Sequence, residues 1–158
     1  LWESCVVENQ IFTCSALQFA KEFQPKHDYQ DKMGNIKMIW ATTPNDWDKY
    51  AVHLIEPVLN LLDKRGKLEK VQPIKHGAYV EWESGVSAIF KTTGDIASPI
   101  WIKIQREYGF QDMYFQDSFY AFKMALERFV DFVNKKKSNL SITNTKEMVE
   151  ILEKGKNA

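Results

Sequence analysis

The sequence predicts an α+β fold: a single domain in which an antiparallel sheet packs against two long amphipathic helices. Two patterns of apolar residues lead to this class. Over about 44–65 and 113–137 they recur every three or four positions, as on one face of a helix; over 68–92 they alternate, as in a strand. No linker, repeat or low-complexity tract divides the 158 residues, a length that fits one domain. We therefore predict one domain over 1–158.

The segment 44–65 carries the clearest helix signals. Thr43 is placed to cap the first turn, and Pro44 suits the first helical position, where a missing N–H costs no hydrogen bond. Pro57 removes one backbone hydrogen bond, so we expect a kink about one turn earlier, near 51–53. The apolar stripe of this helix consists of Trp47, Tyr50, Ala51, Leu54, Ile55, Val58, Leu59 and Leu62.

Residues 78–92 are predicted to form the central hairpin of the sheet. The Ser-Gly pair at 84–85 is a two-residue turn signal, and the runs on either side carry apolar residues on both faces, which favours a central position. Pro73 cannot donate to a neighbouring strand, so the strand over 68–74 is expected either to lie at an edge or to end at Pro73. Two further strands are expected over 36–40 and 100–104.

The segment 113–137 is predicted to form the second long helix. Its apolar residues fall on one stripe at helical spacing, and we expect this stripe to face the core. Three lysines at 135–137 follow at the carboxyl end, where positive charge is favourable. The stripe consists of Phe115, Phe119, Phe122, Leu126, Phe129 and Val133.

Two shorter helices are predicted from capping boxes, in which a polar residue and a Gln or Glu three positions later satisfy each other's backbone N–H groups. Ser15 and Gln18 open a short helix near the start of the chain. Asn144 and Glu147 open the last helix, which Gly155 is expected to stop.

Charge and cysteine spacing bear on the partners and the compartment. Lys plus Arg is 21 and Asp plus Glu is 21, so no whole-molecule field draws the chain to nucleic acid or to an anionic membrane. No stretch is long and apolar enough to span a bilayer. Cys5 and Cys14 fit no C-x-x-C metal or redox spacing. We predict two reduced thiols in a cytoplasmic protein; a disulfide, or a metal-binding or catalytic thiol, remains an alternative.

No catalytic or cofactor motif appears in the sequence. The chain lacks G-x-S-x-G, and its seven glycines form neither a phosphate-binding loop nor G-x-G-x-x-G. His53 lies beside the apolar stripe of the first long helix and is interpreted as a border residue. We therefore predict no cofactor and a non-catalytic protein-interaction module, such as an accessory subunit, an inhibitor or an immunity-type partner of another protein.

The surface for such a partner is predicted in the segment 106–115, REYGFQDMYF. Aromatic residues and Met crowd around a glycine in what is interpreted as a connection, and connections are normally polar. This composition is typical of interface anchors, although the segment could instead cover the end of the core. The predicted partner-binding residues are Arg106, Tyr108, Phe110, Met113 and Tyr114.

Two alternative functions remain open. Glu81 and Glu83 point to one side of a predicted strand, with Asp95 after the next one, and such carboxylates could hold Mg²⁺ in a metal-dependent nuclease or phosphodiesterase. Nuclease sites of this kind also use a lysine that has an acidic residue two positions before it. The candidate lysine here is Lys91, and the position two before it is the apolar Ile89. The second alternative is a small-molecule or lipid carrier with a cavity between the sheet and the Phe-rich helix.

Overall fold

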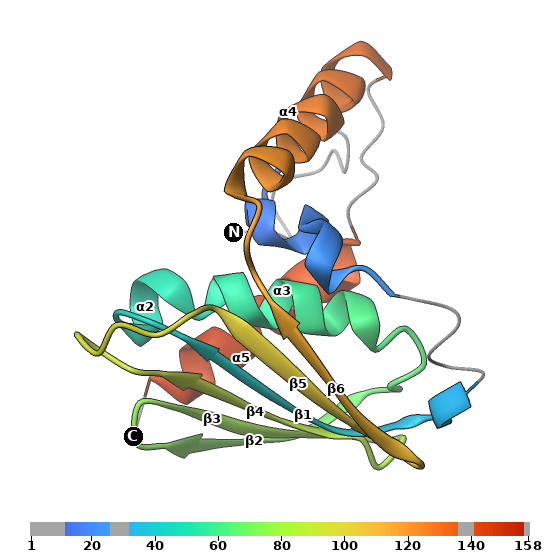
Figure 1. Cartoon of the computed structure of the whole chain (residues 1–158), viewed down its shortest axis with the longest axis vertical. Coiled ribbons are helices and arrows are strands. Elements are labelled where there is room, and N and C mark those ends of the chain that lie inside the picture. Colours follow the sequence, from blue (N-terminus) through green and yellow to red (C-terminus); the bar gives the residue numbers. More distant parts are fainter. Residues whose placement is uncertain (1–11, 26–31, 136–140, 157–158) are drawn as a thin grey trace.

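The computed structural model describes residues 12–25, 32–135 and 141–156. They form a six-stranded mixed sheet packed against helices, which confirms the predicted α+β class (Figure 1). The outer limits of the domain within 1–158 stay a prediction. In chain order the elements are η1 (Ala16–Phe19), η2 (Lys21–Phe23), β1 (Ile36–Thr43), α2 (Trp47–Tyr50), α3 (Val52–Leu61), β2 (Leu68–Ile74), β3 (Gly77–Trp82), β4 (Ser87–Thr92), β5 (Trp101–Arg106), β6 (Gly109–Tyr114), α4 (Ser118–Lys135) and α5 (Ile142–Gly155).

The sheet has the strand order β2-β3-β4-β1-β5-β6. Neighbouring strands are antiparallel except β1 and β4, which run parallel. The parallel pair arises because the chain crosses from β1 through α2, α3, β2 and β3 before it reaches β4, and parallel neighbours need such a crossover. The predicted hairpin over 78–92 is the interior pair β3–β4, and β2, which contains Pro73, is at an edge as expected.

The turn between β3 and β4 has three residues rather than the predicted two. The N–H of Trp82 donates to the carbonyl of Val86 at 3.1 Å, which encloses residues 83–85. Gly85 has φ of 80°, the left-handed conformation that closes a three-residue hairpin with a bulge.

The first long helix begins at Trp47 instead of Pro44. Asn45 takes a left-handed φ of 65° and bridges to Gly94, so the chain cannot enter the helix earlier. The helix is interrupted at Ala51 between α2 and α3, within the region where a kink was predicted from Pro57. The apolar stripe packs on the sheet, with Leu54, Ile55, Val58 and Leu59 fully buried.

Residues 109–114 form strand β6, which corrects the interpretation of 106–115 as a connection. β6 pairs with β5 along its whole length, and only Glu107 and Tyr108 form the turn between them. The following helix therefore begins at Ser118 rather than at residue 113.

The helix α4 does not cover the sheet, so the prediction that its stripe faces the core is wrong. Figure 1 shows α4 standing above η1, while α3 and α5 cover one face of the sheet. Ala121, on the side of α4 that approaches η1, is buried, whereas Phe119 is 79% exposed and Leu126 is 64% exposed. The sequence pattern identified the apolar stripe correctly and assigned it to the wrong surface.

Candidate functional site

A serine–histidine pair joins the start of the described chain to α3. The Oγ atom of Ser15 lies 2.7 Å from Nδ1 of His53. Ser15 is buried and caps η1, where its Oγ accepts the N–H of Leu17 at 3.2 Å, so its predicted capping role is confirmed. Because Oγ accepts that N–H, its own hydrogen is available to Nδ1 of His53.

A buried carboxyl group lies beside this pair. Glu56 is three residues after His53 on α3 and is only 7% exposed. Its Oε2 accepts the backbone N–H of Ser15 and the side-chain N–H of Gln18. Burial raises the pKa of Glu56 to about 7, against the opposing effect of the Ser15 N–H. The group is therefore poised to gain or lose a proton near neutral pH.

His53 is half-buried, and burial lowers its pKa below the usual value. The imidazole is therefore neutral at pH 7 and carries one proton, on either Nδ1 or Nε2. The Ser15 hydroxyl can donate to a bare Nδ1 or accept from a protonated Nδ1. Nε2 can thus act as a proton acceptor or as a proton donor while the Ser15–His53 hydrogen bond is kept.

The same geometry argues against a nucleophilic serine. In a Ser-His-acid triad the serine bonds one ring nitrogen and the acid bonds the other. Here Glu56 accepts from the backbone N–H of Ser15, and the Ser15 hydroxyl is buried where a substrate carbonyl would have to reach it. The cluster is suited to proton exchange at His53 rather than to acyl transfer.

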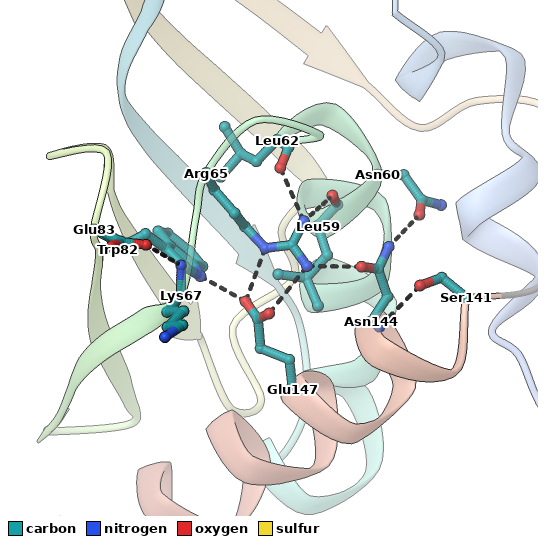
Figure 2. A network of polar contacts seen from close by, with 10 residues as sticks. All are labelled: Leu59, Asn60, Leu62, Arg65, Lys67, Trp82, Glu83, Ser141, Asn144 and Glu147. Carbon is teal, nitrogen blue, oxygen red and sulfur yellow. Dashed lines mark hydrogen bonds and ion pairs between the residues drawn. The ribbon is translucent and has the colours of Figure 1, made fainter.

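A line of amides connects this cluster to the last helix. Oε1 of Gln18 accepts from Asn60 at 3.4 Å. Oδ1 of Asn60 in turn accepts from Asn144 at 3.1 Å (Figure 2). Oδ1 of Asn144 accepts from Arg65 at 2.7 Å. Gln18 was predicted to close one capping box and Asn144 to open another. Instead their side chains belong to this line of amides, and Ser141 caps α5.

Arg65 is the centre of the network that Figure 2 shows. Its guanidinium forms a two-bonded ion pair with Glu147, at 2.9 and 3.0 Å, and both side chains are about nine-tenths buried. It also donates to the carbonyls of Leu59 and Leu62 at the end of α3, and Trp82 donates to Glu147. All five guanidinium N–H groups of Arg65 donate within the protein, so this network is a structural clamp between α3, α5 and the sheet rather than a ligand site.

A small pocket opens next to Glu56, between η1, α3 and the start of α5. It offers room for little more than a water molecule, so it suits a bridging water or a proton path rather than a substrate. Its lining residues are Thr13, Gln18, Glu56, Asn60, Ser141, Asn144 and Thr145.

The structure separates the five predicted partner-binding residues. Arg106 and Met113 are buried on the helix side of the sheet, at 8% and 5% exposure. Tyr108, at the β5–β6 turn, and Phe110 and Tyr114, on β6, are exposed. Whether the three exposed residues contact a partner stays a prediction, while the two buried ones have a structural role.

The predicted metal ligands do not gather into a site. Glu81 accepts a hydrogen bond from Tyr79 within β3, Glu83 accepts the N–H of Lys67, and Asp95 lies in the loop after β4. Within the described ranges, no group of three or more His, Cys, Asp and Glu residues is placed to hold a metal ion.

Cys14 is a half-buried free thiol, while Cys5 lies outside the described residues. Burial, and to a lesser degree the nearby Glu56 carboxylate, raise the pKa of Cys14 to about 11, which is typical of an unreactive thiol. In the part of the chain that the structure describes, no helix has the length and apolarity to cross a membrane. The cytoplasmic location stays a prediction.

Comparison with known proteins places the fold among oxidoreductase structures. No family model and no curated protein sequence matches the chain. Among solved structures, GenD2 from gentamicin A biosynthesis, in complex with NAD, is similar with a TM-score of 0.71 and 10% identity over 89% of this chain and 59% of its own. Myo-inositol 2-dehydrogenase from Lactobacillus plantarum has a TM-score of 0.60 and 13% identity over 94% of this chain and 62% of its own.

A third similar structure is biliverdin reductase from Synechocystis sp. PCC 6803, in complex with biliverdin and NADP+. It has a TM-score of 0.59 and 11% identity, over 82% of this chain and 56% of its own. The chain thus spans about three fifths of the length of these three structures. At such identities the likeness is one of fold.

The residues present do not fit the dinucleotide that two of these structures contain. A dinucleotide site is built on parallel strands and a glycine-rich turn that opens a helix. The sequence has no G-x-G-x-x-G, and within the described ranges the sheet has one parallel strand pair, β1–β4. The cradle for such a cofactor is therefore not formed by the described part of this chain.

These findings correct the prediction of a non-catalytic accessory, inhibitor or immunity-type interaction protein. That prediction relied on missing catalytic motifs, but the fold is shared with dehydrogenases and a reductase, for which the sequence offers no short motif. The nuclease and carrier alternatives are set aside with it, since none of the three structures described above carries either name.

Proposed function

We propose that this chain forms the acid–base part of a nicotinamide-dependent oxidoreductase acting on an alcohol or carbonyl compound, with His53 as the proton-exchanging group. The observation that carries the proposal is the 2.7 Å Ser15–His53 pair beside the protonatable Glu56, on a fold whose solved neighbours include dehydrogenases.

The chemistry of the pair suits this reaction class. Oxidation of an alcohol to a carbonyl compound requires a base that removes the hydroxyl proton, and the reverse reaction requires an acid that returns it. His53 is neutral at pH 7 because burial lowers its pKa, so it can accept that proton at Nε2. In the neutral tautomer that has a bare Nε2, Nδ1 already carries the ring proton and donates it to Ser15 Oγ, and this hydrogen bond holds the ring in place before and after Nε2 is protonated.

The nearby carboxyl group supports the same role. A protonated His53 would carry a positive charge close to Glu56, whose pKa of about 7 lets it ionise when that charge appears. Ser15 positions both groups, through its hydroxyl on His53 and its N–H on Glu56. No described residue is assigned to the nucleotide or to the carbon that changes oxidation state.

Steady-state kinetics of the full-length protein that contains this chain test the proposal. The protein is assayed by nicotinamide absorbance with NAD+ and NADP+ against a panel of inositols, sugars and hydroxy acids. We expect turnover of at least one alcohol, and loss of a general base should lower kcat by roughly 10²–10⁴-fold in His53→Gln. Absence of turnover with every compound, or a His53→Gln variant as active as the wild type, would show the proposal to be wrong.

A second histidine provides the matched control. His76 is exposed at the turn between β2 and β3 and has φ of 59°, a conformation that Asn also tolerates. His76→Asn removes one imidazole without touching the Ser15–His53–Glu56 cluster, so its kcat should equal that of the wild type.

A further inference from the structure

A cleft opens at the end of the sheet where α3 ends and β1 begins. Its volume is about 640 Å³, which falls in the range of small-molecule sites in proteins. The segments around it are the end of α3 with the loop that follows, the first residues of β1, the β3–β4 turn and the last residue of β5. In Figure 1 this is the end of the sheet at which the β5–β6 turn lies.

The cleft is separate from the Ser15–His53 pair. His53 is the second residue of α3, whereas Asn60, which lines the cleft, is near the end of that helix. At a rise of about 1.5 Å per residue, these two positions are roughly 10 Å apart along the helix axis. Asn60 also lines the small pocket beside Glu56. The cleft is therefore a neighbour of the candidate site, and the proposed function makes no use of it.

Arg106 is a buried cation in the lining of this cleft, and the described residues leave its charge uncompensated. The side chain is 8% exposed. Its Nη1 donates to the carbonyl of Gly34 at 3.0 Å, whereas Nε is buried without a hydrogen-bond partner. Within the described ranges this is the one bond made by the five N–H groups of the guanidinium. A buried charge is costly unless an opposite charge or hydrogen bonds compensate it.

The other charges of the lining do not neutralise Arg106. Lys37 is already paired with Glu107 at 2.9 Å, and Arg65 belongs to the clamp with Glu147. The one carboxylate of the lining is exposed and balances a single exposed lysine, so one positive charge is left over. The charged residues of the lining are Lys37, Asp63, Lys64, Arg65 and Arg106.

The lining also indicates what kind of molecule would compensate that charge. A guanidinium presents planar N–H groups that match the oxygens of a carboxylate or a phosphate. The remaining wall of the cleft is partly apolar, which suits a hydrocarbon or ring portion of the same molecule. The apolar residues of the lining are Pro25, Ile36, Leu61, Leu62 and Val86.

We propose that this cleft binds a small organic anion, a carboxylate or a phosphate ester with an apolar body, whose anionic group pairs with the guanidinium of Arg106. The bond from Nη1 to Gly34 fixes the group, and the ligand supplies the charge that the fold leaves out. The positive charge is delocalised over the guanidinium, so an anion at its accessible edge compensates it without reaching the covered Nε. This site is independent of the proposed function.

Titration of the full-length protein that contains this chain tests the inference. Benzoate and phenyl phosphate carry the two anionic groups on the same ring, and benzamide is the uncharged control; ionic strength is held constant. We expect at least one of the two anions to shift the Nε–H resonance of Arg106 saturably in ¹H–¹⁵N spectra, and benzamide to leave it in place. The anion with the lower dissociation constant identifies the preferred head group.

Thermal unfolding of two matched variants ties the binding to Arg106. At about ten times the dissociation constant, the bound anion should raise the Tm of the wild type by roughly 3–6 °C. Arg106→Met should lose this rise. Lys91→Met should keep it, because Lys91 is exposed on β4 away from the cleft, and the substitution removes the same charge.

Three results would overturn the inference. The first is an Arg106 resonance that responds to neither anion, or responds equally to benzamide. The second is an undiminished rise of Tm in Arg106→Met, and the third is its loss in Lys91→Met. If Arg106→Met does not fold, the resonance titration of the wild type decides alone. None of these results depends on nicotinamide-dependent turnover or on His53, so this inference and the proposed function can fail separately.

Discussion

His53 shows how the role of one side chain depends on a residue far from it in the sequence. Its partner, Ser15, is 38 positions earlier and lies on a different element. The helical pattern around His53 carries no trace of that partner, which is why the sequence supports only a border position. Two signals in the sequence were indirect. Ser15 was predicted to cap a short helix, and the carboxyl group of Glu56 lies between the apolar residues Ile55 and Pro57.

At the same scale, Glu56 should make stability depend on pH. Its pKa is raised from 4.5 to about 7 in the folded protein. Below about pH 4.5 the Glu56 carboxyl group is protonated in both the folded and the unfolded protein. Between about pH 4.5 and about pH 7 the unfolded protein releases this proton while the folded protein keeps it. The free energy of unfolding therefore falls by about 3 kcal/mol in total over this interval. Urea unfolding from about pH 5 to about pH 8 measures this loss.

The variant Glu56→Gln should remove that dependence, because the amide is neutral at every pH in this range. The lowered pKa of His53 acts in the opposite direction, with stability lost as pH falls, so the difference between wild type and Glu56→Gln isolates the carboxyl group. Glu69→Gln, on the exposed edge strand β2, serves as control. An unchanged slope in Glu56→Gln would contradict the assignment.

Among the elements, α5 is held in place by the Arg65 clamp. Removing one partner of a buried ion pair leaves the other charge uncompensated, which typically costs about 3–5 kcal/mol. We therefore expect Arg65→Met to lower the free energy of unfolding by about that amount, because Glu147 remains buried. The double variant Arg65→Met/Glu147→Met should recover most of the loss. Chemical denaturation of the three proteins checks this, and a double variant no more stable than Arg65→Met would argue against it.

Gly155 provides a second test at the scale of the element. α5 ends at Gly155, where the last helix was predicted to stop, and the glycine also permits a close approach, because a Cβ there would collide with the ring of Trp47. Gly to Ala in a helix normally stabilises by up to about 1 kcal/mol. Here we expect Gly155→Ala to destabilise by about 1–3 kcal/mol, because the ring must move. Thermal unfolding measures the sign, and an increase in Tm would refute the close contact.

At the scale of the whole molecule, the described residues form no dinucleotide cradle, which predicts a negative binding result. The 158-residue chain alone should bind neither NAD+ nor NADP+ with a dissociation constant below about 1 mM. A dissociation constant of about 1 mM corresponds to a binding free energy of about −4 kcal/mol, and tighter binding requires a formed site. Isothermal titration calorimetry measures this directly. Saturable binding in the micromolar range would show that the chain holds a cradle of its own.

The sequence by itself determined the α+β class, the interior β3–β4 hairpin, the edge position of β2 and the interruption at Ala51. These features follow from short-range periodicity and from the backbone chemistry of proline, both of which act within a few residues. It also identified the apolar stripe of α4, but not the surface that the stripe faces.

Only the tertiary structure decided the parallel pairing of β1 with β4, the strand β6, the surface that the α4 stripe faces and the meeting of Ser15, His53 and Glu56. Each of these features depends on contacts between segments that are distant in the chain. Local sequence patterns do not specify which distant segment makes the contact. The candidate proton-exchange site has no sequence motif, because Ser15 and His53 lie close together in space but 38 positions apart in the sequence.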